Sequence, residues 1–288
     1  MYANINGTKL FFDVAGKQFV DDGPKMREKP VCFLFHGGPG GDHSCYLPTL
    51  LPLAEVMQLV FIDHRNCGRS EACALETCTL KQNAADADAL RAYLGLEKIY
   101  VLGQSYGGMV AQRYALDFQE HLHGAILVTT APSYRFELTA PGIVMERGTD
   151  EQKLLWQKKA AGEINDLQDY LIRMGSLYHY KWGDEYIQQY LNADLRGLFN
   201  TEVNNYQRCG ELRDFDLVDE LHAIKCPVII FSGKQDFITA PVHSEEIHRA
   251  IPQSELCEVD CASHHIFSDR PDVMFPKIEE FVKNTFSA

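Results

Sequence analysis

This sequence lacks the features that mark membrane, secreted and nucleic-acid-binding proteins. No window approaches the ~18 apolar residues that cross a bilayer, and residues 1–10 lack the charged and apolar layout of a signal peptide. Basic residues are few, with 27 Lys and Arg against 40 Asp and Glu and a net charge of −13. Such a charge disfavours phosphate backbones and anionic lipid surfaces. We therefore expect a cytoplasmic protein that binds neither nucleic acid nor membrane.

The nine cysteines form no recognisable framework. Their number is odd and no two are spaced as Cys-x-x-Cys, which disfavours both a disulfide scaffold and a zinc ribbon. Cys67, Cys73 and Cys78 leave a metal site open, but no histidine has a matching spacing. We expect reduced thiols.

What is present indicates a folded α/β protein. The 288 residues are 45% hydrophobic and 23% charged, close to globular averages, and the length suits one large domain or a core with an insertion. Short apolar runs alternate with helical patterns, as strands and crossover helices do in a parallel sheet. Strands are predicted at residues 9–14, 31–35, 58–62, 99–102, 125–129, 228–231 and 255–259, and helices at 79–94, 109–118, 240–251 and 271–286.

The alternation stops between residues 132 and 221. No strong strand pattern occurs there, and the sequence is helical and rich in aromatic residues such as Trp156 and Trp182. We interpret this stretch as an inserted helical cap. The predicted organisation is a core formed by residues 1–131 and 222–288, with the cap at 132–221. Residues 17–29 are expected to form a polar surface loop.

The most specific motif is Gly-Gln-Ser-Tyr-Gly at residues 103–107, between a predicted strand and a predicted helix. A serine hydroxyl is a weak nucleophile unless it is held exposed beside a base, and a sharp strand-to-helix turn holds it in that way. The helix that follows directs its N-terminal amides toward developing negative charge. Ser105 is therefore the predicted nucleophile.

A second motif, His-Gly-Gly-Pro-Gly at residues 36–40, follows another buried strand pattern. Its glycines allow the N–H of Gly38 to point into a site and, with the N–H of Tyr106, to stabilise the oxyanion of a tetrahedral intermediate. A phosphate-binding loop is the alternative, but the Gly-Lys-Ser/Thr ending is missing. His36, at the end of the strand, is expected to make a structural hydrogen bond.

A third polar stretch, residues 63–70, follows the strand predicted at 58–62. We expect its charged side chains to hold a loop in place. His64 and Cys67 raise the alternative of Cys/His catalysis, but no orienting acid stands near them in a recognisable context. Cys67 also lacks the elbow that surrounds Ser105.

A serine nucleophile needs an orienting carboxylate and a base, which follow it in that order in this architecture. Asp236 comes after a strand pattern that runs into a glycine turn, so it reaches the same sheet edge as Ser105. The last strand pattern is followed by the adjacent His264 and His265. The residues alone leave open which of these two histidines faces the site.

Together these motifs resemble the proline iminopeptidase family (peptidase family S33) of α/β-hydrolases. Residues 36–40 are similar to its HGGPG oxyanion loop, residues 63–70 to its DQRGxGxS motif, and residues 103–108 to its GxSxGG elbow. The resemblance implies an α/β-hydrolase fold, with a mostly parallel central sheet flanked by helices and a helical cap over the site. It also implies a small-molecule or short-peptide substrate and neither a metal nor another cofactor.

The resemblance also chooses between the two histidines. In the family pattern the catalytic His is commonly followed seven residues later by Pro, and Pro271 stands in that relation to His264. The implied catalytic residues are therefore Ser105, Asp236 and His264, with His265 as the alternative base.

Two positions bear on the substrate. Members of the family with this layout often have Glu directly after the catalytic Asp, where it helps to bind a substrate amine, but this chain has Phe237 there. Glu202 resembles the amine-binding Glu of the family's cap segment. A prolyl aminopeptidase or amino-acid amidase is thus the first hypothesis. Phe237 favours the alternative of an esterase or lactonase for small apolar substrates, and the third alternative is a catalytically silent binding protein of the same fold.

Overall fold

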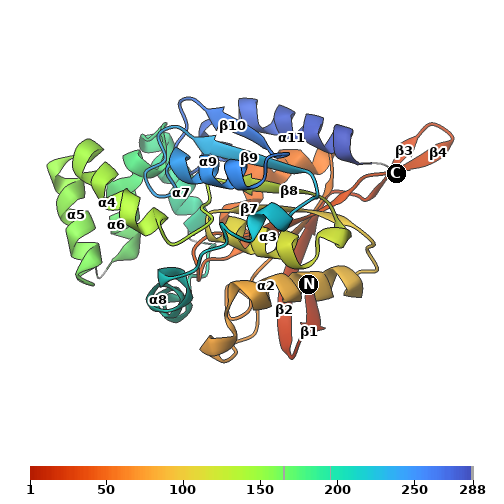
Figure 1. The fold of residues 1–288 in the computed structure, drawn as a ribbon, viewed down its shortest axis with the longest axis horizontal. Coiled ribbons are helices and arrows are strands. Elements are labelled where there is room, and N and C mark those ends of the chain that lie inside the picture. Colours follow the sequence, from red (N-terminus) through yellow and green to blue (C-terminus); the bar gives the residue numbers. More distant parts are fainter. Residues whose placement is uncertain (165, 195, 287–288) are drawn as a thin grey trace.

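The computed structural model describes residues 1–164, 166–194 and 196–286. Within these residues, eight strands form one sheet in the order β1-β2-β6-β5-β7-β8-β9-β10, and two others pair as a hairpin (Figure 1). The strands are β1 (Tyr2–Ile5), β2 (Thr8–Ala15), β3 (Phe19–Asp22), β4 (Lys25–Glu28), β5 (Val31–Phe35), β6 (Gln58–Ile62), β7 (Ile99–Gln104), β8 (Leu122–Val128), β9 (Val228–Gly233) and β10 (Glu255–Val259).

Helices flank the sheet and fill the stretch between β8 and β9. They are α1 (Leu47–Leu50), α2 (Leu80–Tyr93), α3 (Tyr106–Asp117), α4 (Phe136–Arg147), α5 (Asp150–Ala160), α6 (Leu167–Tyr178), α7 (Asp184–Asp194), α8 (Thr201–Cys209), α9 (Pro241–Ala250), α10 (Ile266–Asp269) and α11 (Pro271–Thr285). Among the described residues, no helix is both long and apolar enough to cross a membrane.

The sheet is parallel from β6 to β10 and antiparallel at the end formed by β1 and β2. All seven predicted strands are present, and β5, β6 and β10 have the predicted bounds. The strands β5, β7 and β9 are buried along their whole length, which is why they read as continuous apolar runs. The prediction of an α/β fold with a mostly parallel sheet is confirmed.

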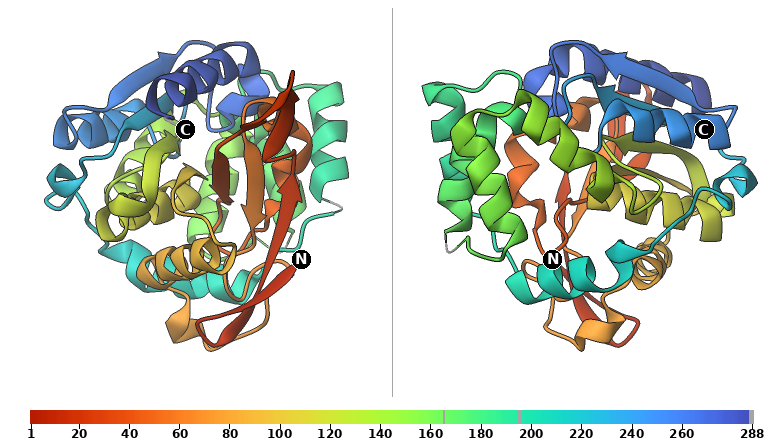
Figure 2. Two further views of the ribbon diagram at one scale, coloured as in Figure 1. Left: turned by 90° about the vertical axis from the view of Figure 1, so that its right-hand side faces the viewer. Right: turned by 60° about the vertical axis from the view of Figure 1, so that its left-hand side comes forward.

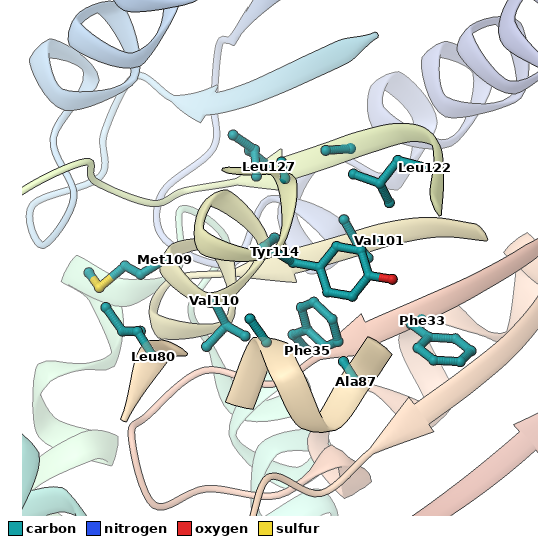
Figure 3. Packing of buried hydrophobic residues seen from close by; sticks show 14 of the residues in the cluster. Phe33, Phe35, Leu80, Ala87, Val101, Met109, Val110, Tyr114, Leu122 and Leu127 are labelled. Carbon is teal, nitrogen blue, oxygen red and sulfur yellow. The ribbon is translucent and has the colours of Figure 1, made fainter. Parts of the chain in front are cut away.

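Two hydrophobic cores lie on opposite faces of the sheet, because side chains alternate along each strand. Phe33 and Phe35 of β5 pack with α2, α3 and α9 on one face. Figure 3 shows this packing, with Tyr114 of α3 beside Phe35. Leu34 of the same strand packs on the other face, with α1 and α11. The sheet is thus packed on both faces below the edge where β5, β7 and β9 end.

The stretch predicted as a polar surface loop, residues 17–29, instead contains the hairpin of β3 and β4, which projects from the molecule (Figure 1). The two strands join through a tight turn at Gly23, whose φ is +62°. Every residue of β4 is exposed, so the strand has no alternating apolar face. The stretch thus lies at the surface as expected, but its two strands were not predicted, because a hairpin that buries neither face leaves no periodic signal.

The helices α4 to α8 lie between β8 and β9, and we call residues 136–209 the helical segment. Figure 2 shows them gathered at one side of the sheet. Their own small core includes Leu155, Tyr170 and Met174, and Phe237 from the loop after β9 joins it. The domain boundaries at 131/132 and 221/222 stay a prediction. Residues 165 and 195 of the predicted cap, and 287–288 of the predicted core, lie outside the described residues.

Candidate active site

Ser105 stands on a strained turn between β7 and α3. Its backbone has φ +56° and ψ −121°, a region that non-glycine residues rarely adopt. The turn is closely packed: a Cβ on Gly103 would lie 2.1 Å from the Gly107 carbonyl oxygen, and one on Gly107 would lie 2.0 Å from the Phe35 carbonyl oxygen. Both glycines are therefore required for the elbow, and the Ser105 side chain is left partly exposed.

The loop after β5 lies against this elbow. Gly38 has φ +126°, and a Cβ there would lie 2.9 Å from the Gly41 nitrogen, so only glycine fits this conformation. The Gly37 N–H donates to the Tyr46 hydroxyl (2.7 Å), which fixes the start of the loop. Gly38 is exposed, whereas Tyr106, at the first turn of α3, is buried. Backbone N–H groups at such positions can stabilise an oxyanion.

Asp236 and His264 form a buried pair at the ends of β9 and β10. His264 Nδ1 lies 2.9 Å from Asp236 Oδ2, and the backbone N–H groups of Ile238 (2.8 Å) and Thr239 (3.2 Å) donate to Asp236 Oδ1. Burial alone would raise the pKa of Asp236, but the charge and hydrogen bond of His264 and the donors from Thr239 and Ile238 hold it below its ordinary value. Asp236 is therefore an ionised carboxylate aimed at one imidazole nitrogen.

A side-chain network links this pair to the elbow and to the glycine loop. The Gln104 amide donates to the His264 carbonyl oxygen (3.0 Å), and the Thr129 hydroxyl donates to the same oxygen (2.8 Å). The Tyr46 hydroxyl donates to Gln104 Oε1 (2.6 Å). Gln104 directly precedes Ser105, so one side chain connects the three loops of the candidate site. No sequence pattern indicates this network, because Tyr46 and His264 are 58 and 160 residues away from Gln104 in the chain.

The structure distinguishes the two adjacent histidines. His264 pairs with Asp236, whereas His265 stacks on His179, with ring centroids 4.4 Å apart and an interplanar angle of 11°. Burial holds the pKa of His265 well below its ordinary value, and the charges of His179 and His264 lower it further. His265 therefore belongs to a neutral packing layer behind His264.

His36 makes the structural hydrogen bonds expected of it. Its Nε2 accepts from the His64 N–H (3.1 Å), and its Nδ1 lies 2.8 Å from the Gly37 carbonyl oxygen. The loop at 63–70 is also held as expected: Asp63 Oδ1 lies 2.6 Å from His43 Nδ1, and Arg65 makes two hydrogen bonds to Asp86. These predictions are confirmed.

The cysteines near this loop do not form a reactive centre. All nine are free thiols. Burial raises the pKa of Cys67, and it raises the pKa of Cys78 to about 11, which suppresses the thiolate needed for nucleophilic attack or metal binding. In the described part of the chain, no group of three or more His, Cys, Asp or Glu side chains could hold a metal ion.

The surroundings of Glu202 and of Phe237 differ from those of the buried, hydrogen-bonded Asp236–His264 pair. Glu202, on the first turn of α8, is exposed and lines a shallow hollow that also includes Asn66 and Ser70. Phe237 is fully buried, and its ring contacts Tyr178 of α6 with centroids 4.9 Å apart. In this structure it would influence a substrate only through the residues it supports.

Three charged residues of the helical segment were not singled out from the sequence: Glu137, Lys159 and Arg208. Arg208 of α8 forms an ion pair with Glu137 of α4. Burial raises the pKa of Tyr178 to about 12, with smaller effects from the charges of Arg208, Asp236 and Glu137. The Tyr178 ring lies 6.1 Å from that of His264. The sequence carried no signal for this cluster, because charged residues on helices usually face solvent.

Comparisons with known proteins agree with the geometry. Residues 30–271 match the model of the alpha/beta hydrolase fold family. A proline iminopeptidase of Thermoplasma volcanium is 30% identical, over 91% of this chain and 89% of its own. The proline iminopeptidase PfmaB of Pestalotiopsis fici is 27% identical, over 98% of this chain and 99% of its own. A crystal structure of the Mycobacterium smegmatis proline iminopeptidase shares the fold, with a TM-score of 0.80 at 21% identity, over 99% of this chain and 98% of that one. This chain is therefore a hydrolase of the α/β-hydrolase fold and belongs, within it, to the proline iminopeptidase family.

Proposed function

We propose that this protein is a serine hydrolase that removes an N-terminal residue with a free amine, as a prolyl aminopeptidase or amino-acid amidase does. The observation that carries the proposal is the strained Ser105 elbow, with the Asp236–His264 pair tied to it through Gln104. The 30% identity to a protein named as a proline iminopeptidase supports the aminopeptidase substrate.

The proposed mechanism is acyl transfer in two steps. The Ser105 hydroxyl attacks the substrate carbonyl carbon while His264 takes its proton, and Asp236 orients the imidazolium that forms. The N–H groups of Gly38 and Tyr106 donate to the oxyanion. The intermediate collapses when the C–N bond breaks and His264 returns the proton to the leaving amine. Water, deprotonated by His264, then attacks the acyl-enzyme; the C–O bond to Ser105 breaks, and His264 returns the proton to the serine oxygen as the acid leaves.

Recognition of the substrate amine needs a carboxylate, and two glutamates are candidates for this role. Glu202 is the residue that the family resemblance assigns. Glu137 is within electrostatic reach of Tyr178, which contacts His264. We propose Glu202 as the amine-binding residue and treat Glu137 as its rival, because Glu137 is already paired with Arg208.

The test compares hydrolysis of Pro and Ala p-nitroanilides, the same anilides with a blocked amine, and p-nitrophenyl acyl esters, with Ser105→Ala as the control. We expect turnover of the free-amine anilides and none in the Ser105→Ala variant. Turnover of blocked anilides or esters in place of the free-amine anilides would instead support an esterase, lactonase or amidase role favoured by Phe237. No turnover of any substrate would favour the binding protein.

Matched variants distinguish the roles of Glu202 and Glu137. Glu202→Ala should weaken turnover of free-amine anilides selectively, because a hydrogen bond to a charged group contributes about 1.5–3 kcal/mol. Glu137→Ala is the comparison variant. If only Glu137→Ala has the selective effect, the amine site belongs to Glu137.

A further inference from the structure

The chain just before α8 lies directly against the glycine loop that follows β5. The Asn200 N–H donates to the Gly40 carbonyl oxygen (2.7 Å). Gly40 has φ +89°, and a Cβ on it would overlap the Asn200 carbonyl oxygen. Only glycine therefore allows the two backbones to meet here, and the hydrogen bond from Asn200 fixes where the Gly40 peptide lies.

Gly40 in turn supports Gly38, whose N–H is the proposed donor to the oxyanion. The loop turns so tightly that a Cβ on Gly38 would lie 3.0 Å from the Gly40 nitrogen and 2.9 Å from the Gly41 nitrogen. The backbones of Gly38 and Gly40 are thus in contact. A donor to an oxyanion is effective only in a fixed position, so the place at which Gly40 is held bears on the chemistry at Ser105.

The side chain of Asn200 holds its own backbone in this place. Its Nδ2 donates to the Asn66 carbonyl oxygen (2.8 Å), in the loop at residues 63–70. Its Oδ1 accepts from the N–H groups of Glu202 (3.0 Å) and Val203 (3.2 Å), which makes Asn200 the N-cap of α8. One side chain therefore joins the start of α8 to the loop at 63–70, on either side of the hydrogen bond to Gly40.

A second anchor of the same segment does not involve the Asn200 side chain. The Leu198 N–H donates to Oδ2 of the buried Asp42 (2.9 Å). Arg69 donates to the same carboxylate oxygen (2.9 Å) and to the Arg196 carbonyl oxygen (3.1 Å). Because this anchor remains, a change of the Asn200 side chain should loosen the contact with Gly40 without unfolding the segment.

We propose that Asn200 is a positioning residue for the oxyanion hole. Its side chain fixes the peptide that holds Gly40 and, through Gly40, the N–H of Gly38, so it acts on the reaction without being a catalytic residue. The proposal rests on the proposed function, which takes the Gly38 N–H as a donor to the oxyanion. It also gives the helical segment a part in the chemistry, because a displacement of α8 at Asn200 would displace the glycine loop.

The test follows the labelling of Ser105 by a fluorophosphonate, measured by mass spectrometry of the intact protein. The Ser105 oxygen bonds to phosphorus, its proton passes to His264, and fluoride leaves. The phosphoryl oxygen needs the same N–H donors as the oxyanion of a substrate, but the probe carries no amine. We expect Asn200→Ala to be labelled about tenfold more slowly than the unmutated protein, because a misplaced donor weakens the transition state.

Asn200→Ser separates this role from that of a helix cap. Serine still caps α8, but its hydroxyl is too short to reach the Asn66 carbonyl. Serine would rescue a residue that only stabilises the helix, whereas it should not rescue one that positions Gly40. We therefore expect Asn200→Ser to be labelled as slowly as Asn200→Ala. Its kcat on the Pro p-nitroanilide should fall by the same factor, with KM changed less than about twofold.

The control is Asn205→Ala, which removes an exposed asparagine from α8 and should be labelled at the unmutated rate. Circular dichroism verifies that each variant is folded. A labelling rate of folded Asn200→Ala within about twofold of the unmutated rate, or full rescue by Asn200→Ser, would overturn the positioning role.

Turnover by the unmutated protein separates the two proposals. If Asn200→Ala and Asn200→Ser both slow the labelling of Ser105 but the unmutated protein does not cleave the Pro p-nitroanilide, the aminopeptidase function fails and the positioning role stands. If the unmutated protein cleaves the anilide and Asn200→Ala is labelled at the unmutated rate, the positioning role fails and the proposed function stands.

Discussion

The Asp236–His264 pair at the edge of the sheet and Lys159 with Tyr170 in the helical segment differ in how their polar groups are partnered. At the sheet edge, the Asp236 carboxylate accepts from several donors, and the His264 carbonyl accepts from both Gln104 and Thr129. In the helical segment, the Lys159 ammonium has no anionic partner among the described residues, and the Tyr170 hydroxyl has no hydrogen-bond partner there. The Asp236–His264 pair is therefore held in place by the protein itself, whereas the Lys159 ammonium and the Tyr170 hydroxyl are left without polar partners in the described part of the chain.

This difference follows from how the two regions are built. The loops of the candidate site leave the ends of β5, β7, β9 and β10, which are neighbours or near neighbours in a rigid sheet. The helical segment is attached through Phe237 in its small core and through contacts such as the Asn200 N–H with the Gly40 carbonyl oxygen (2.7 Å). In a fold of this kind, the inserted helices can differ between proteins while the catalytic residues at the edge of the sheet stay the same.

Among the changes at the edge of the sheet, Asp236→Asn is expected to have the largest effect on activity. Asparagine keeps the shape of the side chain but cannot hold the imidazole in the same tautomer, so kcat/KM on the Pro anilide should fall about 10³–10⁴-fold. Because the pKa of Asp236 is already lowered, protonation of this group should not limit the unmutated enzyme at mildly acidic pH. Thr239→Val, which removes one donor to the carboxylate, is the milder control. A loss below tenfold in a folded Asp236→Asn protein would contradict the assignment.

An intermediate effect is expected from Gln104→Leu. This change removes the donor to the His264 carbonyl and the acceptor for the Tyr46 hydroxyl, so His264 and the glycine loop lose their common anchor. We expect kcat to fall about 10–100-fold with little change in KM, because a displaced catalytic group mainly weakens the transition state. Thr129→Val removes one of the two bonds to the His264 carbonyl and should cost less. A change confined to KM would show that Gln104 does not position the site.

The smallest expected effect concerns the stability of the helical segment. Burial lowers the folded-state pKa of Lys159 to about 7, against 10.5 for an ordinary lysine. The unfolded chain therefore binds the Lys159 proton more tightly than the folded protein does. The resulting loss in the free energy of unfolding is at its maximum below pH 7, decreases as the pH rises, and is absent above about pH 10.5. Lys159→Met should raise the free energy of unfolding by about 1–2 kcal/mol at pH 6 and by much less at pH 10.

Urea unfolding at the two pH values measures this difference, with Lys158→Met as the control that should show none. A Lys159→Met effect that is equal at pH 6 and pH 10 would mean that the ammonium is not destabilised by its surroundings.

Burial decided which strands could be predicted from the sequence. Buried strands such as β5 and β6 were predicted with their observed bounds, because burial on both faces leaves a continuous apolar run. The exposed hairpin of β3 and β4 was missed for the opposite reason. Glu202 was singled out by resemblance, but its place in the tertiary structure is an exposed hollow, so its role in amine binding stays a prediction.

By itself, the sequence determined the elbow at Ser105 and the fold that carries it, because the glycines at 103 and 107 and the apolar runs act over a few residues of chain. The family resemblance already pointed to His264. Only the tertiary structure showed that this histidine meets Asp236 while His265 stacks on His179, that Gln104 anchors three loops, and that Lys159 has no anionic partner among the described residues. These outcomes depend on side chains that are distant in sequence and become neighbours only when the sheet and the helices pack, and no local pattern encodes which partners will meet or remain unmet.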